Sequence, residues 1–458
     1  MSTDIAVSLA DRLGGVLAAD RFAVDEATVL GYRHDRSGWA PAGRPAAVVF
    51  PENAEEVALV LRLAHAQRVP VVIRGAGTGL SGAATAVDGE LVLSTERMNA
   101  ILELSEQDEL AVVQPGVVTG DLDRAAAEHG LCYAPDPGSV DICTIGGNIA
   151  TNAGGLRCAK YGVTRDSVLG LDIVLADGSR ISTGRRTVKG VTGYDLTGLF
   201  VGSEGTLGVV VAATVRLFPL PSQSATISAF FDDARGAARA MSAIRERRVR
   251  PAIAELLDRA SLAAIDAAQG TDLGRRGGAL LLVQVDGAGS EAESAIVQQA
   301  VAPFSGAVEA TSDPEAAAAL LRARRLALPS LEARGRVLIE DVAVPRSRLA
   351  EAIEAVEEIG ARTGTDISTV AHAADGNLHP LFVLDRDADT VPEHVWAAAG
   401  EVFRTALRLG GTLTGEHGVG LLKRQWVREE LGEANHDLQL RVKNLFDPYG
   451  ILNPGKAL

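Results

Sequence analysis

Three glycine-rich clusters, at residues 74–82, 135–155 and 202–209, constrain the fold of this chain more than any other feature of its sequence. Glycine reaches backbone conformations that other residues avoid, and it lets the chain pass close to another group. The chain contains 49 glycines in no strict period, which excludes a collagen-like fibre. The clusters therefore predict loops that lie against a ligand, with elaborate loop structure and no ligand as the alternative.

The first cluster, Arg-Gly-Ala-Gly-Thr-Gly-Leu-Ser-Gly, directly follows the apolar segment 69–73, which we predict to be a strand. Alternating glycines let successive N–H groups converge on an anion, and Arg74 adds a positive charge. The cluster departs from the dinucleotide-binding fingerprint, because Leu80 occupies the position of its third glycine. We interpret it as a diphosphate-binding loop, and a tight turn without a ligand is the alternative.

The second cluster is more unusual, because residues 144–155 contain four glycines and two asparagines. Such a sequence packs a core poorly. It suits a chain that lies flat against a rigid planar ligand, with N–H groups and amides facing polar ring edges. The third cluster, Gly-Ser-Glu-Gly-Thr-Leu-Gly-Val, strengthens this interpretation, because three such clusters together favour a ligand over loop structure alone.

The three clusters resemble those of the FAD-binding domain of the vanillyl-alcohol oxidase superfamily, also called the PCMH-type fold. The resemblance covers nearly the whole chain, and its nearest branch contains D-lactate dehydrogenases, glycolate oxidases and D-2-hydroxyglutarate dehydrogenases. It implies an α+β fold with a PCMH-type FAD-binding domain, an α+β substrate (cap) domain, and a C-terminal segment that packs back on the FAD domain. Members with covalently attached flavin often carry His in the first loop. Thr78 holds that position here, so the resemblance implies noncovalent FAD.

In this family the first loop embraces the pyrophosphate, and the other two clusters line the adenosine and the isoalloxazine. Transferred to this sequence, the resemblance implies that the residues contacting FAD are Arg74, Gly75, Ala76, Gly77, Thr78, Gly79, Ser81, Pro137, Gly138, Ser139, Thr144, Gly146, Gly147, Asn148, Thr151, Asn152, Gly154, Glu204, Gly205, Gly208 and Val209.

The length and patterning of the chain indicate more than one domain. Its 458 residues exceed what one small core requires, and 47% hydrophobic with 22% charged residues is an ordinary globular balance. Two prolines in residues 217–221 mark a boundary. We predict an N-terminal helix and FAD-binding domain over residues 1–221, a substrate domain over 222–409, and a C-terminal segment over 410–458 that completes the active site.

Local signals predict several elements within these domains. Asn53 is expected to cap a helix that follows a buried strand at residues 47–50. Asp-Gly pairs at residues 88–89 and 177–178 predict hairpins. Further elements are expected over residues 5–30, 232–248, 290–301 and 315–321 as helices and over 280–285 as a strand.

Charge and cysteine content exclude several classes of function. A net charge of -15 argues against a nucleic-acid partner, since phosphate contacts need a basic face. Three cysteines without a C-x-x-C pair fit a reducing cytosol, and they are one short of the thiolates of a usual iron–sulfur cluster. The sequence shows no secretory signal and no apolar run of transmembrane length. We expect a cytoplasmic protein, with peripheral membrane association left open, and the sequence is compatible with a homodimer.

A first polar cluster in the C-terminal half, His-Ala-Ala-Asp-Gly-Asn-Leu-His, occupies residues 372–379. If Asp375 and Gly376 form a two-residue hairpin turn, His372 lies directly opposite His379. Their Cβ atoms would then be roughly 4.5–5.5 Å apart on one face. Two imidazoles so placed can share one divalent ion.

A second polar cluster, Thr-Gly-Glu-His-Gly-Val-Gly, occupies residues 414–420. In an extended chain, adjacent side chains point in opposite directions, so Glu416 can reach a metal while His417 points elsewhere. Each histidine alone is more often structural than catalytic. The two polar clusters together favour a site.

The resemblance assigns roles to these residues. In the hydroxy-acid dehydrogenase branch, the residues matching His372, His379 and Glu416 bind a divalent metal, often zinc, with manganese also compatible. The residue matching His417 is the general base.

The residue matching Arg324 holds the substrate carboxylate in this branch. Arg322 and Arg325 lie close by and compete for this role, and a solvated helix face that carries all three arginines is the alternative.

These roles combine into one mechanism. The metal chelates the carboxylate and 2-hydroxyl of the substrate, His417 removes the hydroxyl proton, and hydride passes to flavin N5. In members that oxidise D-2-hydroxyglutarate, polar residues meet the distal carboxylate, and here Leu328, Ile339 and Leu381 match those positions. An apolar pocket favours a monocarboxylate such as D-lactate or glycolate, with a longer apolar 2-hydroxy acid left open.

The electron acceptor is expected to be external: a quinone, a cytochrome, an electron-transfer flavoprotein or an iron–sulfur subunit. Three alternatives stay open at this point. In the first, the chain is the flavin subunit of a multi-subunit glycolate or lactate oxidase. In the second, it is a D-2-hydroxyglutarate dehydrogenase. In the third, it is a metal-free flavoprotein that is non-enzymatic or acts on a sugar or phenol.

Overall fold

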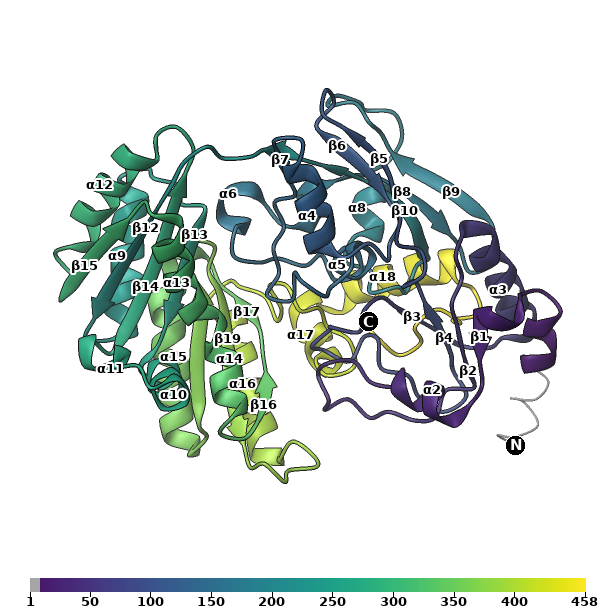
Figure 1. Ribbon diagram of the computed structural model, residues 1–458. Coiled ribbons are helices and arrows are strands. Elements are labelled where there is room, and N and C mark those ends of the chain that lie inside the picture. The colour runs from purple at the N-terminus through teal and green to yellow at the C-terminus, as the bar shows by residue number, and fades with distance from the viewer. Residues whose placement is uncertain (1–8) are drawn as a thin grey trace. The chain divides into compact units, whose positions relative to one another are not determined.

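The computed structural model describes residues 9–458, which form two compact units (Figure 1). Unit 1 consists of the chain up to residue 154 together with residues 162–220 and 416–458, and unit 2 consists of residues 155–161 and 221–415. Both units combine helices with β-sheets, which confirms the predicted α+β fold class.

The helix expected over residues 5–30 is not continuous. Its first four positions lie outside the described residues. Residues 9–14 are helical, and a turn, the 3-10 helix η1 (Ala19–Arg21) and the strand β1 (Phe22–Ala23) separate them from the short helix α2 (Glu26–Gly31). Asp25 starts α2, because its side chain accepts a hydrogen bond from the amide of Thr28.

Unit 1 contains three sheets and mostly short helices. Its strands are β1 (Phe22–Ala23), β2 (Ala47–Val49), β3 (Val71–Arg74), β4 (Leu91–Ser94), β5 (Ile101–Ser105), β6 (Leu110–Val113), β7 (Leu131–Cys132), β8 (Val168–Val174), β9 (Arg180–Gly184), β10 (Val209–Arg216) and β11 (Phe218–Pro219). Its other helices are η1 (Ala19–Arg21), α3 (Ala54–Gln67), α4 (Thr119–Ala127), α5 (Ile145–Thr151), α7 (Thr164–Ser167), α8 (Leu196–Phe200), η3 (Arg424–Trp426), α17 (Val427–Leu431) and α18 (Glu433–Phe446).

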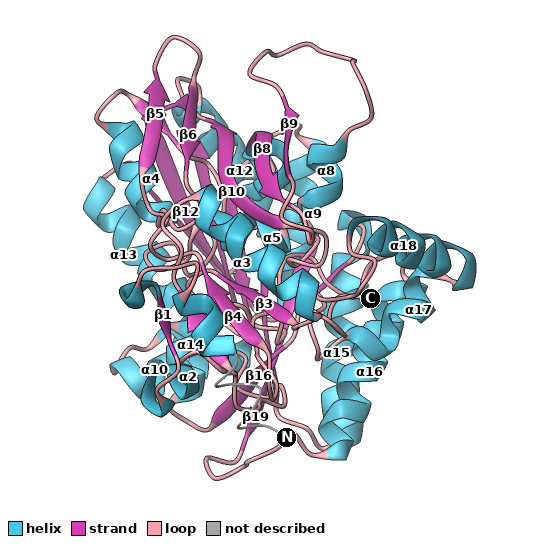
Figure 2. Cartoon of the chain, turned by 90° about the vertical axis from the view of Figure 1, so that its right-hand side faces the viewer, coloured by secondary structure: helices cyan, strands magenta, loops and turns pink. Residues whose placement is uncertain are grey.

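The sheets of unit 1 are mixed or antiparallel. The first has the order β1-β2-β4-β3, with β4 parallel to both β2 and β3, and the second is antiparallel with the order β5-β6-β10-β8-β9. The hairpin at residues 177–178 is confirmed by the pairing of Val174 with Arg180. The hairpin predicted at residues 88–89 is wrong. Gly89 lies in a turn with a φ of 80°, but the next strand, β4, pairs in parallel with β2 and β3. A long loop leads from β9 to α8 (Figure 2).

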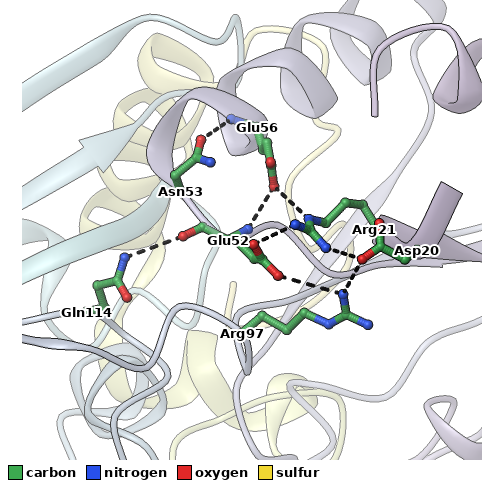
Figure 3. Close-up of polar contacts among 7 residues, drawn as sticks. All are labelled: Asp20, Arg21, Glu52, Asn53, Glu56, Arg97 and Gln114. Carbon is green, nitrogen blue, oxygen red and sulfur yellow. Dashed lines mark hydrogen bonds and ion pairs between the residues drawn. The ribbon is translucent and has the colours of Figure 1, made fainter. Parts of the chain in front are cut away.

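A polar network fixes the start of α3, as Figure 3 shows. The Asn53 side chain caps the helix by accepting from the Glu56 amide at 3.0 Å. The Glu56 carboxylate accepts from the Glu52 amide at 2.8 Å, and Arg21 pairs with the Glu52 carboxylate at 2.5 Å. Gln114, which directly follows β6, donates to the Glu52 carbonyl at 3.5 Å. The network therefore ties the two larger sheets of unit 1 together.

Unit 2 is built on one antiparallel sheet of eight strands. The strand order is β15-β12-β14-β13-β18-β19-β16, and β17 also pairs with β19. The strands are β12 (Ser224–Phe231), β13 (Ile253–Leu257), β14 (Ala279–Asp286), β15 (Ala307–Thr311), β16 (Arg336–Ile339), β17 (Val342–Ala343), β18 (Ile367–His372) and β19 (Asn377–Leu384).

Helices cover this sheet in two groups. The first group, α9, α12, α15 and α16, packs together, and the second group, α10, α11, α13 and α14, also packs together. Their bounds are α9 (Ala234–Glu246), α10 (Arg259–Gln269), α11 (Leu273–Arg276), α12 (Ser290–Val301), α13 (Pro314–Arg325), α14 (Ala327–Glu332), η2 (Arg346–Arg348), α15 (Leu349–Thr363) and α16 (Glu393–Arg408), and the short α6 (Cys158–Tyr161) also belongs to unit 2. The helices expected at residues 232–248, 290–301 and 315–321 are confirmed as α9, α12 and α13.

Candidate functional site

The three glycine clusters converge in unit 1. A Cβ atom on Gly75 would lie only 2.5 Å from the Thr144 hydroxyl, so the first and second clusters touch there. The amides of Gly202 and Glu204 donate to carbonyls at the C-terminal end of α5, each at 2.8 Å. The first and third clusters therefore both adjoin α5, which belongs to the second.

The first cluster presents unused hydrogen-bond donors. Within the described residues, the amides of residues 76–80 donate to no protein acceptor. Arg74 is 9% exposed and donates to the His34 carbonyl at 2.7 Å. A Cβ on Gly77, whose φ is 72°, would overlap the Arg74 guanidinium. Free N–H groups beside a buried guanidinium fit a diphosphate, and this is the fit expected of an FAD loop.

The polar side chains of the second cluster form hydrogen bonds within the protein. The Thr144 side chain caps α5, accepting from the Gly147 amide. Asn148 donates to the Thr119 hydroxyl at 2.7 Å, and Asn152 ends the helix with a φ of 53° while accepting from the Arg165 amide. These polar side chains are engaged by the protein, so contact with a cofactor by this cluster remains a prediction that rests on its backbone and glycines.

The third cluster anchors the C-terminal segment. The Glu204 carboxylate accepts from the amides of Val419 and Gly420, each at 2.8 Å. Burial raises the pKa of Glu204, and these two amide hydrogen bonds oppose that rise. Ser81, from the first cluster, donates to the Gly418 carbonyl at 2.8 Å. Residues 418–420 are thus held by the first and third clusters together.

This anchoring places Glu416 and His417 beside the glycine clusters. A Cβ on Gly154 would overlap the Glu416 carboxylate, so that side chain lies directly on the second cluster. The expectation that Glu416 and His417 diverge is wrong. Residues 415–417 bend instead of extending, and His417 Nε2 approaches a Glu416 carboxylate oxygen at 3.8 Å.

In unit 2, β18 and β19 bring His372 and His379 together, although the expected register is wrong. A four-residue loop, 373–376, connects the strands, and His372 pairs with Asn377 while His379 pairs with Val370. The register is shifted by two residues, and because side chains alternate with a period of two, both histidines still lie on one face. Their ring centroids are 5.0 Å apart.

Glu255, which the sequence analysis did not identify, links two of the predicted site residues. It lies in β13 opposite His372 and is completely buried. One carboxylate oxygen is 2.6 Å from His372 Nδ1, and the other accepts from Arg324 Nε at 2.6 Å. Burial alone raises the pKa of Glu255, but His372 and Arg324 outweigh it and lower the pKa below its usual range. A single acid within an apolar strand, residues 253–257, is the signal that could have found it.

Asp341 is a second acid that was missed. It is completely buried, and its Oδ2 accepts from the Thr414 hydroxyl at 2.5 Å and the Gly415 amide at 2.8 Å. Its Oδ1 lies 3.9 Å from His379 Nδ1. Asp341 therefore holds Gly415, the residue before Glu416, while its other oxygen lies close to His379.

Of the three neighbouring arginines, only Arg324 has a buried ion-pair partner. Its side chain is 17% exposed, whereas Arg322 and Arg325 are exposed. The last turn of α13 thus directs one guanidinium towards the sheet and two towards solvent.

The three apolar positions considered for specificity belong to one core cluster. Ile339 in β16 lies directly opposite Leu381 in β19, and Leu328 packs against the same cluster. Leu381 is two residues beyond His379, so both side chains lie on the same face of the sheet.

Within residues 9–458, no helix is long and apolar enough to cross a membrane.

Comparisons with known proteins match both halves of the chain. Residues 45–184 match the FAD binding domain, and residues 220–457 match the C-terminal domain of FAD linked oxidases. Glycolate oxidase subunit GlcD of Bacillus subtilis is 44% identical over 417 residues, covering 90% of this chain and 88% of that protein. D-lactate dehydrogenase of Archaeoglobus fulgidus is 36% identical over 431 residues, covering 93% and 95%. The structure of p-cresol methylhydroxylase matches with a TM-score of 0.82 at 17% identity, covering 100% of this chain and 97% of that one, and so shares the fold.

Proposed function

The chain belongs to the FAD-linked oxidases and is an FAD-dependent hydroxy-acid oxidoreductase, and we propose that it oxidises D-lactate or glycolate with the help of a divalent metal ion. We further propose that its electrons pass to an external acceptor: a quinone, a cytochrome, an electron-transfer flavoprotein or an iron–sulfur subunit. Bound FAD supplies the hydride acceptor at N5, and the metal supplies a Lewis acid that lowers the pKa of the substrate hydroxyl.

The observation that carries the metal proposal is the paired geometry of His372 and His379. Metal-binding histidines usually give their second ring nitrogen to a carboxylate or carbonyl. Glu255, 2.6 Å from His372 Nδ1, is such a carboxylate. The two rings lie 5.0 Å apart, a separation that suits ligands of one ion. We propose zinc or manganese as that ion.

Glu416 is the proposed third ligand. It follows Gly415, whose amide is held by Asp341 near His379. Its carboxylate oxygens also lie on Gly154, in the cluster proposed to line the flavin. Within unit 1, this position suits a metal ligand that lies beside the flavin.

His417 and Arg324 have the remaining proposed roles, proton transfer and substrate binding. His417, as a neutral imidazole, accepts the proton of the substrate hydroxyl. Arg324 binds the substrate carboxylate through its two terminal nitrogens, because its Nε is already engaged by Glu255. Fixing the carboxylate restricts which face of the 2-carbon meets the flavin.

The apolar positions Leu328, Ile339 and Leu381 support a monocarboxylate substrate. A second carboxylate placed against this cluster would lose its water without gaining a partner. D-2-hydroxyglutarate is therefore the less favoured substrate.

A second candidate function is that of a flavin subunit. It is favoured by the relative of 44% identity, whose printed name is that of an oxidase subunit. A chain of this kind would reduce artificial dyes but would need a partner to reach its natural acceptor.

Anaerobic flavin bleaching tests the proposed function. The yellow protein is mixed with D-lactate, L-lactate, glycolate or D-2-hydroxyglutarate, before and after chelation. We expect D-lactate or glycolate to bleach the flavin, chelation to abolish the reaction, and zinc or manganese to restore it. His372→Ala should fail to bleach the flavin, and added zinc or manganese should not restore bleaching. His394→Ala, at an exposed histidine, should behave like the unchanged protein. Bleaching that chelation leaves untouched would refute the metal's role.

A further inference from the structure

Residues 34–37, a segment outside all three glycine clusters, border the first glycine loop. The His34 carbonyl accepts from the Arg74 guanidinium at 2.7 Å. The amides of Arg36 and Ser37 donate to the carbonyls of Gly77 and Gly79 at 3.0 and 3.1 Å. This segment therefore forms one wall of the loop whose amides face no protein acceptor.

Asp35 lies at the centre of this wall. It is 6% exposed, and its Oδ1 accepts from the Ser37 amide at 3.1 Å and the Ser37 hydroxyl at 2.6 Å. Its Oδ2 is buried and has no hydrogen-bond partner among the described residues. A Cβ on Gly79 would lie 3.5 Å from this oxygen, so Oδ2 faces the glycine loop.

A buried acceptor without a donor is costly, and native structures seldom leave one. Here the unsatisfied oxygen adjoins a loop whose N–H groups are also unused. A diphosphate bound by those N–H groups would have its own oxygens close to this wall. Two anionic oxygens at hydrogen-bonding distance require a shared proton.

Several groups face the Asp35 carboxyl. Burial raises its pKa, and the two hydrogen bonds that Oδ1 accepts from Ser37 oppose the rise, with smaller opposing effects from the nearby Thr85 hydroxyl and Gly82 amide. The Asp35 charge interacts with two nearby cations, Arg74 and Lys456, and acts to raise the pKa of each. The burial outweighs the hydrogen bonds, so the pKa of Asp35 lies above its ordinary value.

We propose that Asp35 binds FAD as a neutral carboxylic acid, donating its Oδ2 hydrogen to a diphosphate oxygen of the cofactor. This inference rests on the FAD site proposed above. It adds a binding residue that precedes the first glycine cluster by almost forty positions.

The test compares Asp35→Asn with Asp35→Ala in FAD titrations of the apoprotein, followed by flavin fluorescence. Asparagine keeps the shape and offers an N–H donor at the same place, so its Kd should stay within about threefold of the unchanged protein. Alanine removes the donor and should weaken binding roughly tenfold to a hundredfold, the scale of one lost hydrogen bond to a charged group. Asp25→Asn, at an exposed helix cap of the same region, is the matched control.

The phosphorus NMR spectrum of bound FAD gives a second measurement that does not depend on activity. With saturating FAD, Asp35→Ala should move a diphosphate resonance. Asp35→Asn binding as weakly as Asp35→Ala would overturn the proposal, because an N–H donor at this position would then fail to replace the proposed O–H donor. Unchanged affinity and unchanged resonances in both variants would also overturn it. Failure of the unchanged protein to bind FAD would instead refute the cofactor site itself.

Discussion

Replacing Glu255 with glutamine tests the central polar linkage of unit 2. The carboxylate is completely buried between His372 and Arg324, at 2.6 Å from each. The glutamine side chain keeps the volume but removes the charge. The Arg324 guanidinium, only 17% exposed, then loses its counterion in a poorly hydrated place.

The expected loss of stability follows from this burial. Removing one partner of a buried ion pair costs roughly 3–5 kcal/mol. We expect a value near the lower end, about 3 kcal/mol, because the amide keeps one hydrogen bond and water reaches part of Arg324. Zinc affinity should fall about 10–100-fold, because the ring of His372 loses the group that orients it.

Urea unfolding of the metal-free protein and zinc titration by calorimetry measure the two effects. Asp313→Asn is the control: Asp313 is an exposed helix cap of the same unit, and only its Oδ1 accepts a hydrogen bond, from the Ala316 amide at 2.8 Å. Asparagine is an equally good helix cap, so this variant should change stability little. Equal unfolding free energies and zinc affinities for Glu255→Gln and the unchanged protein would refute the reasoning.

Three further outcomes are expected. The pKa of Glu255 is lowered on folding, so its stabilising contribution is present above its ordinary value of 4.5 and is lost as the pH falls through the folded value; urea midpoints of the unchanged protein should drop there more than those of Glu255→Gln. His417→Ala should keep FAD but slow flavin reduction by about 10²–10⁴-fold in anaerobic stopped flow, and a normal rate would remove His417 from the mechanism. Gly77→Ala should weaken FAD binding in fluorescence titrations through overlap with Arg74, whereas Gly89→Ala, also at positive φ but in open space, should not; equal affinities would contradict this.

Elements governed by local signals were predictable from the sequence. The helix α12 begins and ends where its pattern indicated, and Asn53 caps α3 because its side chain bonds an amide three positions ahead. The turn at residues 88–89 failed as a hairpin for a different reason. A glycine turn sets the local backbone, but the partners of β4 are strands distant in sequence, which pair with it in parallel.

The sequence predicted which residues belong to the candidate site better than it predicted the hydrogen bonds that join them. His372 and His379 share a face in either register, because a shift of two residues preserves the face. Glu255 was missed because its link to His372 spans 117 positions, and no local spacing encodes such a contact. The bend at residues 415–417 was missed because it depends on Asp341, another distant residue.

Glycine content alone does not show which cluster touches a ligand. A Cβ on Gly146 would lie 2.5 Å from Pro115, and one on Gly208 would lie 2.7 Å from Ile173, so protein packing already requires glycine at both positions. The first cluster differs, because its amides at residues 76–80 donate to no acceptor within the described chain and the buried Asp35 oxygen faces them. Packing does not explain these unused groups. A bound diphosphate would accept hydrogen bonds from the loop amides, and a protonated Asp35 would donate one to it. Substitutions at the packing glycines should therefore lower stability before they lower cofactor affinity, and Gly79→Ala, whose Cβ would meet only the Asp35 oxygen at 3.5 Å, should do the reverse.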